Sequence, residues 1–247
     1  MKGDYLISKS NKLVSSRYDL SLQEQRIILT LVSLLNPQED LELKEFEFKI
    51  LDFCKLIGVE SEKNHTHIKR TTEKLMSRVL KIQEEDRLLQ INWISSCEYL
   101  DRQGIVKICF DKKLAPYLLQ LKDKFTSYYL SNVLRMKSKH SIRLYELLKC
   151  YQFKRSFTLE LDELKEMMKC ESYKQYGHFK SRVIEQALKE INSQTDIHAD
   201  YTEIKQGRRV AALEFKIESS SKLESELYWS EEKEDIFGEK YRQGLLL

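Results

Sequence analysis

Apolar residues recur along the chain at a helical spacing in some segments and at a strand spacing in others. Leu20–Leu35 follows a helical period, and the following Asn36-Pro37 would end that helix. Leu41–Ile50 alternates apolar and charged residues and predicts a strand. Asp52–Ile57 then predicts a short helix, and Asn64–Leu80 predicts a longer one. The first part of the chain therefore combines helices with at least one strand.

A hairpin is predicted after the longer helix. Alternating apolar residues indicate strands around Leu89–Trp93 and Val106–Phe110, joined through a turn at Asp101–Gly104. Pro116–Phe125 then predicts a connecting helix, whereas residues 1–19 show little periodicity and suggest a mobile arm. This order of helix, strand, two helices and hairpin is typical of a winged helix, so we expect residues 1–125 to form one such domain.

The same order returns in the second half of the chain. Its predicted elements are a helix at Ser138–Tyr151, a strand at Ser156–Leu159, a helix at Leu161–Met168, a long helix at Tyr176–Asn192, and a hairpin of Ile197–Tyr201 with Val210–Ile217. Apolar positions of the two long helices match at an offset of 111 residues, as Ile68 does with Phe179. We therefore expect an α+β protein with two tandem winged-helix domains related by a pseudo-repeat, the second covering residues 126–218.

Charge is distributed unevenly over the 247 residues. The net charge is +3, but residues 219–247 carry seven acids against four bases, so residues 1–218 carry +6. This pattern indicates a basic folded part followed by an acidic C-terminal tail. An excess of positive charge is compatible with DNA binding without establishing it.

Several classes of protein are disfavoured by the composition. No apolar run approaches the ~20 residues that span a bilayer, and the first residues lack the features of a secretion signal, so a cytoplasmic location is expected. The five cysteines are odd in number and include no C-x-x-C pair, which favours small core residues over disulfides or a zinc site.

The second long helix and its hairpin carry the strongest functional signal. Polar and basic residues precede or interleave the apolar stripe of the helix, and basic residues surround Gly207 in the hairpin turn. Such groups can bond to phosphates and base edges when a helix enters a major groove. A solvated helix face is the alternative, but the basic turn favours DNA contact. The candidates are Lys174, Tyr176, His178, Lys180, Ser181, Arg182, Glu185, Lys205, Arg208 and Arg209.

Two weaker basic clusters lie earlier in the chain. The first long helix offers Asn64, His65, Lys69 and Arg70 for DNA contact, although a protein interface is an equally good interpretation. Near the junction of the halves, Arg135, Lys137 and Lys139, with His140 and Arg143 beside them, could meet the phosphate backbone or simply begin an exposed helix.

Enzymatic interpretations are poorly supported. His65-Thr66-His67 superficially matches a paired-histidine metal site, but at a helix start residues i and i+2 do not face each other. The chain has no G-x-x-x-x-G-K-[ST] motif for phosphate binding, and no nucleophile–base pairing stands out. We therefore expect a binding protein that is not an enzyme and uses no cofactor or metal.

With these elements in place, the chain resembles the plasmid replication initiators of the iteron-binding, tandem winged-helix family. Four segments carry the resemblance: Asn11–Val14, Leu20–Arg26, Ser138–Leu148 and Phe179–Asn192. The similarity extends over about residues 10–218, and its most specific parts are Ser138–Leu148 and Phe179–Asn192.

The resemblance implies a function that spacing alone does not indicate. Members of this family bind direct repeats, called iterons, in double-stranded origin DNA as monomers, help to open the duplex, and recruit the host initiator and replicative helicase. Many also form a homodimer through the first domain and repress their own gene. The second domain usually makes the principal base contacts. The alternatives are a winged-helix transcriptional repressor without initiator activity, a nicking enzyme, and a protein-interaction scaffold.

Overall fold

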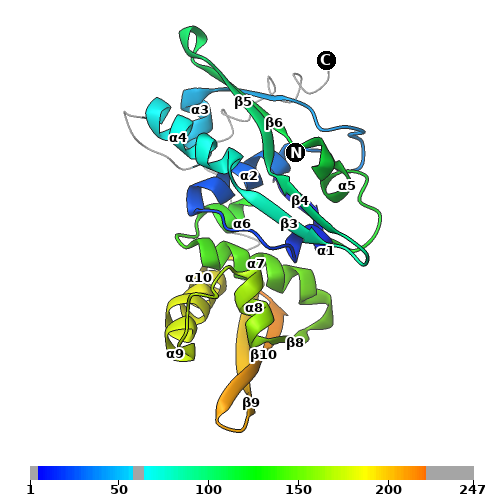
Figure 1. Cartoon of the computed structure of the whole chain (residues 1–247), viewed down its shortest axis with the longest axis vertical. Helices are drawn as coiled ribbons and strands as arrows, with labels where there is room; N and C mark the ends of the chain where they lie inside the picture. Colours follow the sequence, from blue (N-terminus) through cyan, green and yellow to red (C-terminus); the bar gives the residue numbers. More distant parts are fainter. Residues whose placement is uncertain (1–4, 58–63, 221–247) are drawn as a thin grey trace.

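A computed structural model describes residues 5–57 and 64–220, without the side chains of residues 56, 64 and 65. The first four residues of the predicted arm and the acidic tail from residue 221 onward lie outside these limits. Figure 1 shows two lobes stacked along the long axis, with a hairpin projecting from the end of the lower one. No helix in the described part of the chain has the length and apolar character needed to cross a membrane.

The upper lobe begins its winged-helix unit with α2 (Leu22–Ser33), whose start is fixed by a capping box. Ser21 accepts a hydrogen bond from the backbone of Glu24, and the Glu24 side chain accepts one from the backbone of Ser21. There follow β2 (Phe46–Lys49), α3 (Ile50–Leu56) and α4 (Asn64–Met76). A hairpin of β5 (Ile94–Leu100) and β6 (Ile105–Phe110) completes the unit, and β6 pairs with β2.

The lower lobe repeats this plan. It contains α7 (Lys139–Tyr151), β8 (Ser156–Glu160), α8 (Leu161–Met167), a long helical stretch formed by α9 (Tyr176–Phe179), a π-helical segment (Lys180–Glu185) and α10 (Gln186–Gln194), and the hairpin of β9 (Ile197–Gln206) and β10 (Arg209–Ser219). The strand order is β8-β10-β9, which corresponds element by element to β2-β6-β5 in the upper lobe. The predicted pair of tandem winged-helix units is therefore confirmed.

The N-terminal segment is the first place where the structure corrects the sequence-based prediction. From Leu6 onward it is not a mobile arm: β1 (Leu6–Ser10) pairs with β7 (Phe125–Tyr129), and the short α1 (Asn11–Val14) follows it. Ile7 and Leu13 are fully buried. The apolar residues are too few and too irregularly spaced to show a period, yet they pack into the core.

The hairpin assignment in the upper lobe was also wrong in part. Leu89 and Ile91 lie on β4 (Leu88–Asn92), which pairs with β3 (Val79–Gln83) in a separate two-stranded sheet. The partner of β6 is β5, which begins after Trp93. The turn at Asp101–Gly104 was placed correctly, and Gly104 adopts a positive φ of 64° there.

Three element limits differ from the predictions as well. The strand predicted at Leu41–Ile50 is confined to β2, and the long helix α4 ends at Met76 because Val79 and Leu80 belong to β3. The connecting helix predicted at Pro116–Phe125 is reduced to α5 (Ala115–Leu118). The short helix α6 (Leu130–Leu134) follows β7 and leads to α7.

Helix α7 lies between the lobes, and every residue from Ser141 to Leu148 is buried. Its buried Glu146 receives hydrogen bonds from Lys9 of β1 and from the hydroxyls of Tyr18 and Tyr128. Arg143, one turn earlier on α7, is also buried and forms an ion pair with Glu146 at 3.4 Å. We call these five residues the buried charge cluster. It ties the N-terminal strand directly to the first helix of the lower unit.

The predicted division of the chain between residues 125 and 126 falls at the first peptide bond of β7. That strand pairs with β1 of the upper lobe, and its Tyr128 belongs to the buried charge cluster with α7. The buried apolar residues of both lobes also form one continuous core. The limits 1–125 and 126–218 stay a prediction about folding units.

Candidate nucleic-acid interface

The long helical stretch from Tyr176 to Gln194 presents one face to the core. Phe179, Val183, Ala187 and Ile191 are buried as their spacing predicts, and Ile184 joins them. The backbone between Lys180 and Glu185 follows a π-helical path, which was not foreseen. A π segment contains more residues per turn than an α-helix, so it widens the buried face and shifts the directions of the polar side chains.

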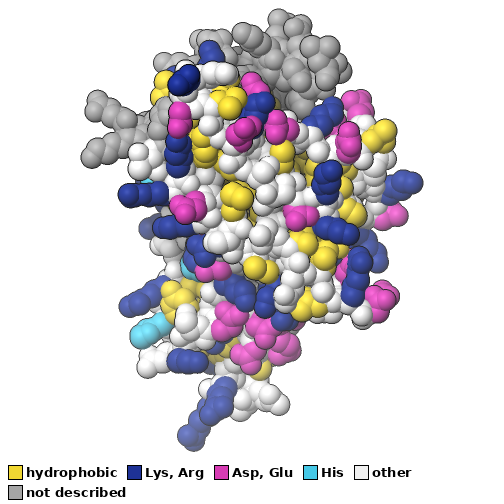
Figure 2. Space-filling view, turned by 45° about the horizontal axis from the view of Figure 1, so that its top comes forward, with side chains coloured by type: hydrophobic (Ala, Val, Ile, Leu, Met, Phe, Trp, Pro, Cys, Tyr) yellow, Lys and Arg dark blue, Asp and Glu magenta, His cyan; other side chains and the backbone are white. Residues whose placement is uncertain are grey.

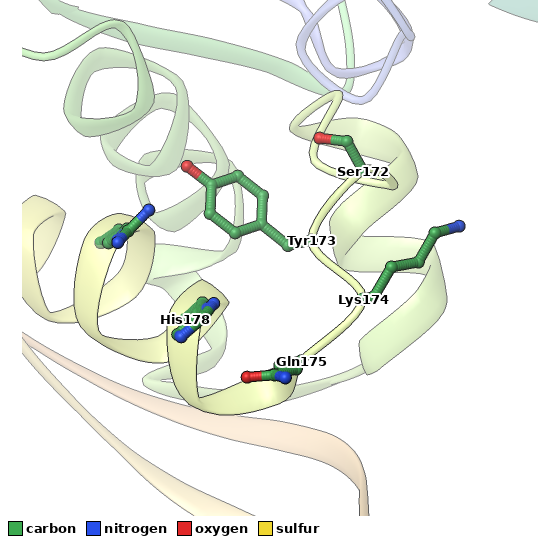
Figure 3. Close-up of a pocket in the computed structure, with 6 residues that line it drawn as sticks. Ser172, Tyr173, Lys174, Gln175 and His178 are labelled. Carbon is green, nitrogen blue, oxygen red and sulfur yellow. The ribbon is translucent and has the colours of Figure 1, made fainter.

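Polar and basic side chains occupy the outer side of this stretch. Lys174, His178, Ser181, Arg182 and Glu185 are all exposed. His178 and Arg182 line a shallow hollow of about 380 Å³ together with Ser172, Tyr173, Lys174 and Gln175 from the preceding loop. Figure 3 shows the Tyr173 ring pointing towards the helical turns, whereas Lys174 extends away from them. This surface offers several donors to an approaching anionic ligand.

The β9–β10 hairpin forms a wing with a basic tip. Gly207 has a φ of 63° at the turn, where the absence of a side chain removes the steric cost of that conformation. Lys205, Arg208 and Arg209 surround it and are exposed. Figure 2 shows Lys and Arg side chains at the lower tip and along one margin of the lower lobe, with acidic side chains gathered away from that margin. The wing and the long helix therefore present positive charge on one lobe.

One carboxylate connects the wing to the helix. Glu203 of β9 accepts hydrogen bonds from the Tyr176 hydroxyl and the Lys180 ammonium, both at 2.9 Å to the same oxygen, Oε1. Its other oxygen lies 4.0 Å from the Lys205 ammonium. The hydrogen bond from Lys180 is the largest of the effects that lower the pKa of Glu203. Two predicted DNA contacts, Tyr176 and Lys180, are thus already engaged within the protein.

Sequence reasoning did not single out Glu203. Glu203 lies two residues after Tyr201 on β9, which indicates only that the two side chains share a face of the strand. Nothing in the spacing places Glu203 opposite a helix residue 23 positions earlier. Ser181 is also engaged, since its hydroxyl donates to the Gly177 carbonyl at 3.0 Å.

The equivalent surface of the upper lobe is less basic. Lys69 on α4 pairs with Asp101 at the wing turn, with an N–O distance of 2.7 Å, and Arg70 is exposed. The side chains of Asn64 and His65 lie outside the described residues. The wing turn of this lobe carries one base, Arg102, beside Asp101, whereas three exposed bases surround the lower wing tip, so the two described surfaces differ in basicity mainly at the wing.

At the junction of the lobes the predicted basic cluster is divided by burial. Arg135 and Lys137 are exposed, and Lys139 forms an ion pair with Asp19 at 2.7 Å. The suggestion that Arg143 meets phosphate was wrong, because this side chain is only 3% exposed and belongs to the buried charge cluster. His140 is half-buried, and burial lowers its pKa to about 4, so it carries no charge at neutral pH.

Two family models together match most of the chain. The model described as "Initiator Replication protein, WH1" covers residues 6–149, and the one described as "Initiator Rep protein, WH2" covers residues 160–217.

Within the residues that the structure describes, no group of three or more His, Cys, Asp or Glu side chains could hold a metal ion.

Two individual proteins and one solved initiator structure are also similar to this chain. A "Replication initiation protein" from Escherichia coli is 27% identical over 234 residues, covering 90% of this chain and 72% of its own length. A "PI protein" from the same organism is 24% identical over 247 residues, covering 85% and 81%. The solved structure titled "Crystal structure of Pi initiator protein in complex with iteron DNA" has a TM-score of 0.73 at 22% identity, covering 90% of this chain and all of that one, and therefore shares its fold. On the strength of the two family matches and the paired helix–wing units, the chain belongs to the replication initiator protein family, with a winged helix of each of its two types.

Proposed function

We propose that this chain is a sequence-specific double-stranded DNA-binding initiator of plasmid replication that acts in the cytoplasm. It binds direct repeats at the plasmid origin as a monomer. The observation that supports this function is the presence, on one chain, of two equivalent helix–wing units of the initiator family. The second unit has exposed basic residues on its helix and at its wing tip. The Pi initiator protein, solved in complex with iteron DNA, has the same fold, which supports direct repeats as the ligand.

The lower lobe is the principal reader in this proposal. Its long helix enters a major groove, where His178, Arg182 and Glu185 face base edges while Lys174 and Ser181 approach the backbone. The basic wing tip lies along the adjacent phosphates through Lys205, Arg208 and Arg209. Tyr176 and Lys180 belong to the same surface through their contacts with Glu203.

The upper lobe and the junction make secondary contacts. Lys69 and Arg70 on α4, with Asn64 and His65 at its start, approach a second stretch of the duplex. Arg135, Lys137 and Lys139 lie between the two lobes and meet the intervening backbone. Because the upper wing turn carries a single base, part of this lobe's surface is left for a second copy of the chain, and this homodimer represses the protein's own gene.

Binding is followed by opening of the origin and recruitment of the host initiator and replicative helicase. These steps need no catalytic residue of this chain, since the protein acts by binding and by bringing other proteins to the opened duplex. The acidic C-terminal tail is assigned no role in this proposal.

A replication assay separates an initiator from a repressor built on the same fold. The gene is supplied in trans to cells that receive a plasmid carrying its upstream DNA and no other origin. Stable replication is the expected result, and it should be lost in Arg182→Ala combined with Arg208→Ala. A chain that binds this DNA tightly but never sustains the plasmid would be a repressor instead.

A further inference from the structure

Glu203 connects the wing of the lower lobe to its long helical stretch through hydrogen bonds with Tyr176 and Lys180. Glu203 lies on the wing, and its two donors lie on the adjacent helical stretch, one on α9 and one at the first position of the π segment. The side chain of Glu203 is 22% exposed, so part of the network is shielded from solvent. One carboxylate oxygen thus joins the two elements that the proposed function directs to adjacent DNA contacts.

The upper lobe contains an equivalent arrangement. Lys69 corresponds to Lys180 at the 111-residue offset that relates the long helices. Lys69 also binds a carboxylate of its own hairpin, Asp101, at 2.7 Å, and its ammonium lies 5.1 Å from the centre of the Tyr99 ring. Asp101 is 65% exposed, so that pair is more open to water than its counterpart. The same position of both units therefore uses a lysine to bridge helix and wing.

We propose that Glu203 is a specificity-determining positioning residue, which holds Tyr176 and Lys180 so that the helix and wing keep one relative orientation and Lys180 is withheld from the DNA backbone. This inference rests on the proposed function of the lower lobe. A fixed orientation favours the DNA sequence at which helix and wing both fit, and withholding one cation reduces the sequence-independent attraction to phosphate.

Glu203→Gln should raise the affinity for unrelated DNA, whereas most substitutions in a binding surface lower it. A glutamine oxygen can still accept hydrogen bonds from Tyr176 and Lys180, but it cannot form an ion pair with Lys180. The ammonium then keeps only a neutral acceptor and the longer, 4.0 Å contact with Glu185, so it can turn to phosphate. One added phosphate contact steepens the slope of log affinity against log salt by about 0.9, so the affinity for unrelated DNA gains about eightfold more than that of the wild-type chain between 1 M and 0.1 M salt. The ratio of specific to non-specific affinity should fall by about fivefold or more, the lower end of what one base contact contributes.

Binding measurements on the full chain test this directly. The probes are a duplex that the wild-type chain selects from a random-sequence pool and a shuffled duplex of the same composition. Each is titrated between about 50 and 200 mM salt, a range over which one phosphate contact changes the affinity about 3.5-fold. Glu214→Gln is the matched control, since Glu214 lies on β10 of the same sheet and bonds to Ser156 and Thr202. It removes the same charge without releasing Lys180, so its salt slope should stay close to the wild-type value.

Two further variants separate the roles of the donors. Tyr176→Phe should lower the specificity ratio without changing the salt slope, because it loosens the helix and frees no charge. In a Lys180→Met background, Glu203→Gln should no longer steepen the slope. Thermal unfolding of each variant checks that the fold is retained.

The outcomes distinguish the inference from the function on which it rests. If Glu203→Gln weakens binding to both duplexes equally with an unchanged slope, or if Glu214→Gln steepens the slope as much, the inference is overturned while the DNA-binding function stands. If the wild-type chain selects no sequence and binds the two duplexes alike, the proposed function fails and the inference fails with it.

Discussion

Replacing Glu146 with glutamine perturbs the buried charge cluster that joins β1 to α7. Glutamine has nearly the same shape, but it keeps only one of the two oxygens, to which Tyr128 (Oε1) and Tyr18 (Oε2) donate separately. One hydroxyl must therefore turn to accept a hydrogen bond from the new amide NH2. The substitution removes the negative charge that faces Lys9 and Arg143. The structural change is therefore small, and the electrostatic change is large.

The size of the destabilisation expected for Glu146→Gln follows from the burial of Lys9 and Arg143. Lys9 and Arg143 are 1% and 3% exposed, so neither can recover its hydration when Glu146 loses its charge. Arg143 retains the Ser16 carbonyl at 2.6 Å and the face of the Tyr18 ring at 4.4 Å. Breaking one partner of a buried ion pair typically costs about 3–5 kcal/mol. We expect a loss of that size in the free energy of unfolding, a large part of the ~5–15 kcal/mol of a typical domain.

Urea unfolding monitored by circular dichroism measures this loss, with Glu163→Gln as the control. Glu163 is an exposed acid on α8, and its replacement should change the free energy of unfolding by no more than about 0.5 kcal/mol. A loss below about 1 kcal/mol for Glu146→Gln, the range of an exposed ion pair, would refute the importance of the cluster. Adding Lys9→Met should recover part of the loss, because it removes one of the two unpaired cations.

The pH dependence gives a second measure of the same cluster. Burial alone would raise the pKa of Glu146, but the charges of Lys9 and Arg143 outweigh it and lower the pKa below the ordinary value of 4.5. The folded state therefore binds the proton less readily than the unfolded state does. The stabilisation from Glu146 is fully present above pH 4.5 and is lost as the pH falls through the lower, folded-state pKa. Below pH 4.5 the wild-type chain should lose stability more steeply than Glu146→Gln, and parallel curves would contradict this assignment.

Three further predictions concern the lower lobe. Arg182→Ala should cost about 1–3 kcal/mol in binding and relax preference at one base position in a selection experiment, whereas uniform weakening on all sequences would make Arg182 a phosphate contact. Arg208→Ala with Arg209→Ala should flatten the salt slope by about 1.8, and an unchanged slope would remove the wing tip from the interface. Gly207→Ala should destabilise the wing turn by about 1 kcal/mol, because the φ of 63° disfavours a side chain; equal stability in urea unfolding would contradict that reason.

The lower lobe shows how much of the fold can be predicted from sequence. Ser138 caps α7 where the polar start of the motif indicates, and the apolar stripe of Phe179, Val183 and Ile191 faces the core as its period requires. Both helices are long enough for periodicity to be clear. The wing is also recognisable, because Gly207 and its basic neighbours interrupt two alternating runs.

The errors arise where a local pattern does not identify a distant partner. Alternation at Leu89 and Ile91 correctly indicates a strand, but it says nothing of whether the neighbour is β3 or β6. Lys9 looks like a solvent-exposed residue of a polar arm, and its partner Glu146 lies 137 positions away. Val79 and Leu80 fit the helical period of α4 and yet belong to a strand.

Some residues of the candidate nucleic-acid interface can be predicted from the sequence, whereas others depend on distant contacts. Exposed bases such as Arg182 and Arg208 could be identified from sequence because they interrupt or follow the apolar pattern. Glu203 could not, since its importance depends on a contact between β9 and a helical segment whose π-helical path is not encoded in any simple period. Burial likewise decides that Arg143, despite its basic neighbours, has no access to DNA.

Discrimination between DNA sequences is the most direct test of the central claim, that the lower lobe reads DNA. The measurement compares the affinity of the full wild-type chain for the duplex it selects from a random pool with its affinity for a shuffled duplex, as salt is varied. The expected ratio of the two affinities is at least about 10³, and both affinities should fall steeply as salt rises. Arg182→Ala should reduce the ratio without abolishing binding. Equal affinity of the wild-type chain for the two duplexes, or binding that ignores salt, would contradict the claim.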